Sequence, residues 1–357
     1  MIGLHCHGHD LCGMPMGMNC VCHMNLVEGK CDYRKVIDNP RANDRLFHYV
    51  REHNGNYYYV PFFESRLLIW NYENKKKRVI DLHLDDRYEQ AGVGKFYNIA
   101  FYRKKAYLIP FGYQAIVSID LENGKVDHYM DMRSEFQGGK GFLFSRYVHT
   151  NEYQILLPSL MSNHVITANL QAGTYERDSI GNQQYRFSGV VKSANSMWFI
   201  LKNDLCIIEK DLTTNEEKEY RDFPDGCKPD ERHCFDDKAI VLYGKYIYCF
   251  PAGSNKAVRF HTEEKIFEEL TEFQKYCENK KINRRYSIFN GCAQNGSEIY
   301  LNYQLGTVIR YNLRTGEIAE YEKSAKHLGM WIIGDIPQSA VRESKEACGA
   351  KIHRMAI

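Results

Sequence analysis

The sequence predicts an all-β fold built from six similar four-stranded units, and three observations support this. Short apolar or aromatic runs alternate with period two, which is typical of strands. Tight polar turns of hairpin length separate the runs. Finally, the turn that ends the third run of each unit recurs at a nearly constant spacing along the 357 residues. Such a repeat indicates a stack of small sheets.

The unit is clearest between Phe96 and Tyr129. Its first run (97–101) alternates, its second (106–110) is apolar, and its third (115–119) is rich in β-branched residues. The third run ends in the turn 120–124, where Asn123 and Gly124 tolerate positive φ. A fourth, more polar run (125–129) follows. Four such runs in succession predict an antiparallel meander.

Copies of this turn appear six times. Successive positions of its first residue (71, 120, 169, 211, 261 and 312) differ by 49, 49, 42, 50 and 51 residues. The second run has a parallel series of apolar segments at 59–61, 108–110, 156–158, 198–200, 249–251 and 299–301. We therefore expect the units to span residues 46–82, 96–130, 142–178, 185–220, 239–270 and 286–321.

This layout resembles β-propeller proteins over residues 45–322. A lone four-stranded sheet cannot bury both faces, so neighbouring sheets must stack around an axis, and 26 tyrosines and 18 phenylalanines suit wedge-shaped gaps. Neither a WD dipeptide nor a Kelch Gly-Gly doublet occupies the equivalent positions, so the subfamily is not identified. The resemblance implies a six-bladed β-propeller, or a seven-bladed one if residues 33–38 pair with residues 330–333.

Residues 1–44 differ in composition, and we expect them to form a segment and linker outside the propeller. Residues 1–32 contain five of the twelve cysteines, four histidines and four of the methionines that follow Met1. Thiolate, imidazole and thioether groups hold zinc, copper(I) or iron–sulfur centres. The candidate metal ligands are Cys6, His7, His9, Cys12, Cys20 and Cys22. Because no CxxC pair is present, a flexible leader with reduced cysteines, or a disulfide, is the alternative.

The turns between second and third runs open on one face of a propeller, together with the connections between blades. They carry varied polar residues, which would suit a polar ligand such as a glycan, a peptide or a partner protein. The candidate ligand-binding residues are Arg66, Gln114, His164, Asn203, Asn255 and Gln304. For any one of them the alternative is an ordinary role in a hairpin turn.

Charge and hydropathy limit the partners and the location that we expect for the protein. The formal net charge is +2, which argues against a nucleic-acid partner. No run approaches the roughly 18 apolar residues of a membrane span, and the first residues lack the apolar core of a signal peptide, so a cytoplasmic location is expected. Residues 323–357 are predicted to hold a closing segment and a helix that begins near Asp335.

Two functions are compatible with these features. The first is a non-catalytic ligand-binding or scaffold propeller with a metal-binding N-terminal segment. The second is a propeller-type lyase or hydrolase that acts on a carbohydrate, with a metal or an acid pair at its face. No nucleophile elbow, phosphate loop or HExxH motif is present, which favours the first.

Overall fold

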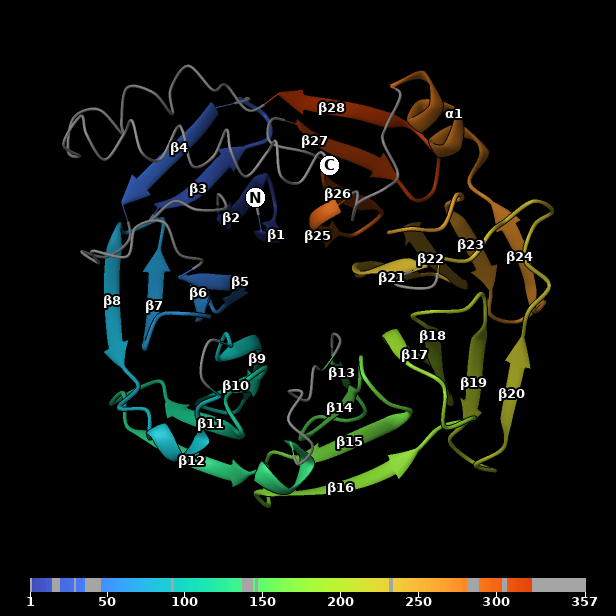
Figure 1. Ribbon diagram of the computed structural model, residues 1–357. Coiled ribbons are helices and arrows are strands. Elements are labelled where there is room, and N and C mark those ends of the chain that lie inside the picture. The colour runs from blue at the N-terminus through green and yellow to red at the C-terminus, as the bar shows by residue number, and fades with distance from the viewer. Residues whose placement is uncertain are drawn as a thin grey trace.

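The computed structural model describes residues 2–14, 20–28, 30–35, 46–90, 93–136, 144, 147–230, 234–280, 289–303 and 307–322. These residues form seven four-stranded antiparallel sheets arranged around a central axis (Figure 1). The β-propeller prediction is therefore confirmed, with the seven blades that the sequence left as its alternative. In each blade the first strand lies nearest the axis and the fourth lies on the outside (Figure 1).

Each blade contains four strands that are consecutive in the chain. The first four blades contain β1 (Ile2–His7), β2 (Asp10–Met14), β3 (Cys20–Asn25) and β4 (Lys30–Lys35); β5 (Phe47–His53), β6 (Asn56–Pro61), β7 (Arg66–Asn71) and β8 (Lys76–Asp81); β9 (Phe96–Tyr102), β10 (Lys105–Pro110), β11 (Ala115–Asp120) and β12 (Val126–Asp131); β13 (Val148–His149), β14 (Gln154–Pro158), β15 (His164–Asn169) and β16 (Thr174–Ser179).

The last three blades follow the same order. They contain β17 (Phe187–Ser193), β18 (Ser196–Leu201), β19 (Ile207–Asp211) and β20 (Glu217–Tyr220); β21 (Phe235–Tyr243), β22 (Tyr246–Pro251), β23 (Val258–His261) and β24 (Ile266–Glu269); β25 (Phe289–Asn295), β26 (Glu298–Tyr303), β27 (Thr307–Asn312) and β28 (Ile318–Glu322). Among the described residues each blade is made of consecutive strands, and β1 packs against β25 where the first and last blades of the ring meet.

One turn, between the third and fourth strands, repeats in all seven blades. The last residue of the third strand accepts hydrogen bonds from backbone N–H groups two or three residues later, as an Asx turn does. The accepting residues are Asn25, Asn71, Asp120, Asn169, Asp211, His261 and Asn312. In blade 6 the ring nitrogen Nδ1 of His261 takes the place of the carboxylate or amide oxygen.

Residues 2–35 form blade 1, whereas the sequence analysis placed residues 1–44 outside the propeller. The signal for this blade is present in the sequence. Asn25-Leu26 with Gly29 repeats the pattern of Asn169-Leu170 with Gly173, and the spacing to Asn71 is 71 − 25 = 46 residues. The unusual cysteine, histidine and methionine content concealed it. The proposed pairing of residues 33–38 with residues 330–333 lies partly outside the described residues.

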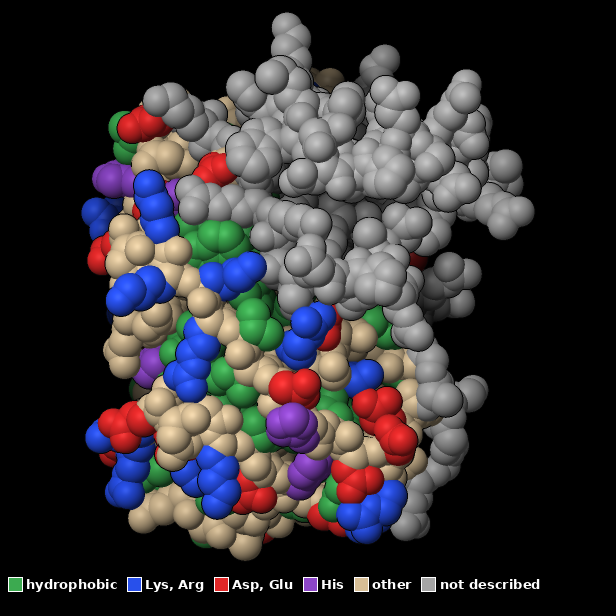
Figure 2. Space-filling view, turned by 90° about the vertical axis from the view of Figure 1, so that its left-hand side faces the viewer, with side chains coloured by type: hydrophobic (Ala, Val, Ile, Leu, Met, Phe, Trp, Pro, Cys, Tyr) green, Lys and Arg blue, Asp and Glu red, His purple; other side chains and the backbone are tan. Residues whose placement is uncertain are grey.

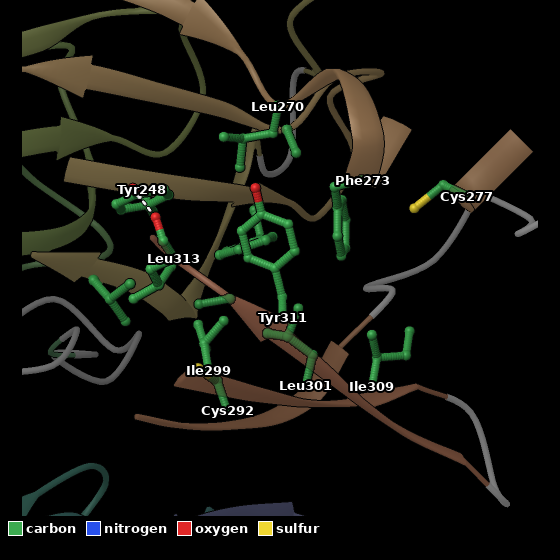
Figure 3. Packing of buried hydrophobic residues seen from close by; sticks show 14 residues of the cluster. Tyr248, Leu270, Phe273, Cys277, Cys292, Ile299, Leu301, Ile309, Tyr311 and Leu313 are labelled. Atoms are coloured by element: carbon green, nitrogen blue, oxygen red, sulfur yellow. Dashed lines mark hydrogen bonds between the residues drawn. The ribbon is translucent and has the colours of Figure 1, made fainter. Parts of the chain in front are cut away.

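Hydrophobic clusters fill the gaps between neighbouring blades. Between blades 6 and 7, Phe250, Phe273 and Tyr311 make edge-to-face contacts with ring centroids 5.0–5.8 Å apart. Phe273 belongs to α1 (Thr271–Asn279), which connects these blades and buries Phe273 and Cys277 one turn apart (Figure 3). The buried Tyr248 hydroxyl donates to the Leu313 carbonyl at 2.6 Å, which ties blade 6 to blade 7 (Figure 3).

The outer strands are mostly polar. Five of the six residues of β8 are exposed, and Lys, Arg, Asp and Glu side chains are interspersed over this side of the molecule (Figure 2). In the described part of the chain, no helix has the length and apolar character needed to cross a membrane. The predicted closing segment and C-terminal helix at 323–357 lie outside the described residues.

Candidate ligand-binding channel

The first strands of the blades surround a channel, and a cleft of about 300 Å³ opens on it. Four successive blades supply its walls. It is lined by Tyr147 and Val148 of blade 4, Gly189, Val190, Val191 and Lys192 of blade 5, Ile240, Val241 and Leu242 of blade 6, and Gln294 of blade 7.

The cleft combines apolar and polar surface in similar amounts. Its apolar part includes valine and isoleucine side chains of β17 and β21. Gly189 keeps the two strands close, because a Cβ there would lie 3.0 Å from Cδ1 of Ile240. Tyr147, Lys192 and Gln294 supply a hydroxyl, an ammonium and an amide. A wall of this kind, with few well-placed polar groups, is typical of ligand sites.

Polar side chains bond to backbone carbonyls of neighbouring inner strands. The Tyr147 hydroxyl donates to the carbonyl of Ile99 at 2.8 Å, and Arg51 donates to the same carbonyl at 3.5 Å and to the Tyr147 hydroxyl. Lys192 donates to the carbonyl of Thr150. The innermost strand of a blade has one edge without a partner strand, so its carbonyls must find other donors. These side chains provide them.

The Gln294 amide makes the same kind of contact, because it donates to the carbonyl of Leu242 at 3.4 Å. Beside it, Asn295 donates to the carbonyl of Gly8 at 2.9 Å and so links blade 7 to blade 1. At the edge of the channel, backbone carbonyls therefore already accept hydrogen bonds from long polar side chains of a neighbouring blade.

His5 and His149 are neutral at pH 7. Burial, followed by the positive charge of Arg51, lowers the pKa of His5 to about 4. Burial and then Arg51 also lower the pKa of His149. Burial raises the pKa of the Tyr147 hydroxyl to about 12, so this group stays protonated.

Five of the six candidate ligand-binding residues lie in the described part, at the end of the blades that carries the turns between second and third strands. Arg66 begins β7, Gln114 precedes β11, His164 begins β15, and Asn203 and Asn255 lie in turns. Gln304 lies outside the described residues. The structure distributes them over five blades and brings none of them into the channel cleft.

Three of these residues have local partners. Arg66 Nε donates to Glu64 Oε1 at 2.9 Å, and His164 Nδ1 lies 3.0 Å from the Ser179 hydroxyl. Asn255 accepts from the backbone N–H of Lys228 at 2.7 Å and donates to the carbonyl of Gly226. The Arg66 contact matches the turn-stabilising alternative, whereas Asn255 ties its turn to the connection between blades 5 and 6. A ligand role for the six residues stays a prediction.

The candidate metal ligands are divided between two faces of blade 1, because successive side chains of a strand point to opposite faces. Cys6 and Cys22 pack toward blade 7, and Cys12 packs toward blade 2. His7 and His9 are exposed, and the Cys20 side chain is not described. Within the described residues, no three His, Cys, Asp or Glu side chains are grouped so that they could hold a metal ion. The zinc, copper(I) or iron–sulfur centre stays a prediction.

The sequence analysis did not select Arg51, Tyr147, Lys192 or Gln294. The available signal was weak: Lys192 and Gln294 are polar residues next to the end of otherwise apolar first runs. Arg51 and Tyr147 are separated by 96 residues. Their contact depends on the order of blades around the ring, which the sequence does not state.

No protein-family model matches the chain, and no curated protein does either. Several solved structures are similar. A catalytically inactive virginiamycin B lyase from Staphylococcus aureus with quinupristin has a TM-score of 0.62 at 15% identity, covering 90% of this chain and 94% of that one. YCF48 bound to D1 peptide has a TM-score of 0.60 at 12% identity, covering 87% and 92%. BamB from Moraxella catarrhalis has a TM-score of 0.53 at 10% identity, covering 90% and 85%. At these identities the similarity shows the fold, and the chain is a β-propeller.

Proposed function

We propose that this protein is a non-catalytic binding module whose channel cleft holds an extended segment of a peptide or partner protein. The observation that carries the proposal is the cleft itself, which combines valine and isoleucine side chains with a hydroxyl, an ammonium and an amide. An extended peptide offers what such a surface needs, because it has backbone donors and acceptors as well as side chains for the apolar wall.

The volume and charge of the cleft narrow the ligand. About 300 Å³ is at the small end of the range for ligand pockets, so it accommodates a chain end or a few side chains and not a folded domain. Among the described residues that line it, Lys192 is the one with a charged side chain. A carboxylate, from an acidic side chain or a chain terminus, is therefore the preferred group beside Lys192. The solved complex of YCF48 with D1 peptide supports a peptide ligand for a propeller of similar fold.

The cleft favours binding over catalysis. Among the described residues that line it there is no carboxylate, imidazole or thiol. The Tyr147 hydroxyl has its pKa raised to about 12 by burial and already donates to Ile99. General acid–base catalysis near neutral pH needs a group with a pKa near the working pH, and the cleft does not supply one. The lyase or hydrolase alternative has no comparable support there.

Selection from a library of short random peptides, followed by fluorescence polarisation with the purified protein, tests the proposal. We expect acidic peptides to be enriched and Lys192→Met to weaken their binding roughly ten- to a hundredfold, since a charge-assisted hydrogen bond is lost. Lys104→Met is the matched control, because Lys104 lies in an exposed turn and pairs with Glu122. If the selected peptides bind Lys192→Met as tightly as wild type, the cleft is not their site.

A further inference from the structure

A second groove, of about 420 Å³, lies between blades 5 and 6 at the end of the blades that carries the turns between first and second strands. Blade 5 contributes Trp198 and Glu209 to its lining, and blade 6 contributes Lys245, Glu263 and Lys265. The channel cleft shares none of these residues. The groove is therefore a separate feature of the molecule.

Lys265 places its ammonium group inside an aromatic and acidic enclosure. Its Nζ lies 4.2 Å from the centre of the Trp198 ring and 5.5 Å from that of the Tyr220 ring. The same Nζ lies 2.8 and 2.9 Å from the two carboxylate oxygens of Glu209. Aromatic faces next to a carboxylate are the usual recognition site for an alkylammonium group.

Glu209 is held in place from blade 5. It accepts from the Ser196 hydroxyl at 2.8 Å and from the Tyr220 hydroxyl at 2.7 Å. Burial acts to raise its pKa, but the hydrogen bonds from Lys265, Tyr220 and Ser196 outweigh this and lower it. The carboxylate is ionised at neutral pH and oriented by its own blade, so the enclosure does not depend on Lys265 for its shape.

The backbone at Lys265 does not favour a lysine. It lies in the turn between third and fourth strands with φ of 63°, the left-handed region. The equivalent residues Gly124, Gly173 and Gly316 are glycines with φ of 72–80°, and Asn215 has φ of 61°. Blade 2 also has a lysine at this position, Lys75 with φ of 56°, so the contacts of its side chain and not its backbone distinguish Lys265.

Trp198 also carries a donor without a partner. Its side chain is 1% exposed, and its indole Nε1 has no hydrogen-bond partner among the described residues. A buried donor without a partner is unusual in a folded protein.

We propose that Trp198, Tyr220 and Glu209 form a cage for the alkylammonium group of a lysine side chain on a partner peptide, and that Lys265 occupies this cage as an internal substitute. Lys265 is tethered next to the cage, so an external ligand must compete with a high effective concentration. Its side chain is 31% exposed, so it can leave into solvent. When a peptide displaces Lys265, the hydrogen bonds that join Lys265 of blade 6 to Glu209 of blade 5 are broken as well.

The test removes the internal occupant. Lys265→Asn introduces the residue that blade 5 has at this position, and Lys265→Gly provides a second variant suited to positive φ. Lys75→Asn is the matched control, because Lys75 occupies the same turn position in blade 2 with φ of 56° and is exposed. The probes are the N-acetyl methylamides of lysine and of trimethyllysine, titrated by NMR into each folded variant.

We expect both Lys265 variants to bind a probe at least about tenfold more tightly than wild type and Lys75→Asn do. Adding Glu209→Gln to Lys265→Asn should weaken that binding about tenfold. A preference for the trimethylated probe assigns the cage to methylated lysine, and similar affinities assign it to ordinary lysine. If a folded Lys265 variant binds no better than wild type, or Glu209→Gln has no effect on binding, the proposal is wrong.

Discussion

Blade 1 and blade 5 have the same architecture but very different residues. Blade 5 buries Trp198, Phe199 and Ile200, whereas blade 1 buries Cys12 and Cys22 at equally low exposure. In both sheets the alternation of strand residues decides which side chains face a neighbouring blade. Cysteine and methionine in blade 1 therefore act as small and adaptable apolar residues.

The interfaces of these blades also differ. Between blades 5 and 6, Trp198 and Phe260 lie with their ring centroids 5.4 Å apart. Between blades 1 and 2, His23 stacks on Tyr72 at 4.5 Å, and within blade 2 the hydroxyls of Tyr59 and Tyr72 are 2.5 Å apart. Burial raises the pKa of Tyr59 and of Cys12 far above their ordinary values. The interface of blade 1 with blade 2 thus combines buried apolar side chains with polar rings and a thiol.

The largest expected effect comes from deleting residues 1–45. If blade 1 is a structural member of the ring, its loss exposes the clusters that it shares with blades 2 and 7, and no stable folded monomer should remain. Circular dichroism, thermal unfolding and gel filtration would show this. A truncated protein that unfolds cooperatively as a monomer would contradict the equivalence of blade 1 with the others.

Truncation of a core residue should reduce the free energy of unfolding more in blade 5 than in blade 1. Phe199→Ala in blade 5 should reduce the free energy of unfolding by about 3–5 kcal/mol. Cys22→Ala in blade 1 should reduce it by about 1 kcal/mol, since only one sulfur atom is removed from an equally buried position. Urea unfolding of both variants measures the difference. Equal losses would mean that Cys22 has a role beyond packing.

The polar interface of blade 1 should make stability depend on pH. The pKa of His5 is about 4 in the folded chain and about 6.5 when unfolded, so the unfolded state takes up a proton first as the pH falls. Stability is therefore lost from about pH 6.5 down to about pH 4, by roughly 2–3 kcal/mol. His5→Phe should remove this component from urea unfolding curves measured at a series of pH values. An unchanged pH dependence would contradict the buried, neutral state of His5.

The smallest expected effect is a difference in the labelling rates of cysteine thiols, which can be measured on the wild-type protein. Cys12 and Cys22 are fully buried, whereas Cys227 in the connection between blades 5 and 6 is half-buried. Labelling of Cys12 and Cys22 with a thiol reagent should be on the order of 100-fold slower than that of Cys227, because it requires local opening. Peptide mapping by mass spectrometry gives the rates. Rapid labelling of Cys12 in the native protein would place blade 1 outside the packed ring.

Most of the fold could be predicted from sequence because its turns are local. Asp120 to Gly124 and its copies specify the same hairpin wherever they occur, and six blades followed from them. Asn25 and Gly29 carry the same signal, but the surrounding cysteines and histidines suggested a different chemistry. The helix α1 was not foreseen, because it forms where Phe273 and Cys277 can dock between two blades.

The candidate site could not be predicted in the same way. Lys192, Tyr147 and Gln294 line one cleft because the ring brings three blades to the same channel. No local sequence pattern predicts that these three residues lie together. Turn residues such as Arg66 and Asn255 are candidates in the sequence because they are polar and expected to be accessible. In the structure Arg66 pairs with Glu64 in its own turn, and Asn255 bonds to the backbone of the connection between blades 5 and 6.

Closure of the ring through β1 and β25 has a consequence for protein synthesis. Met24, Cys6 and Cys22 pack against Ala293, Tyr300 and Val308, and Tyr300 is translated 276 residues after Met24 (300 − 24). At ordinary rates of translation the ribosome needs roughly 15–55 s to cover that distance. During this interval one face of the first sheet has no partner, so the nascent chain exposes thiols that the finished protein hides. Oxidative damage to Cys6 and Cys22 should therefore depend on when it strikes, being severe on the ribosome and slight afterwards.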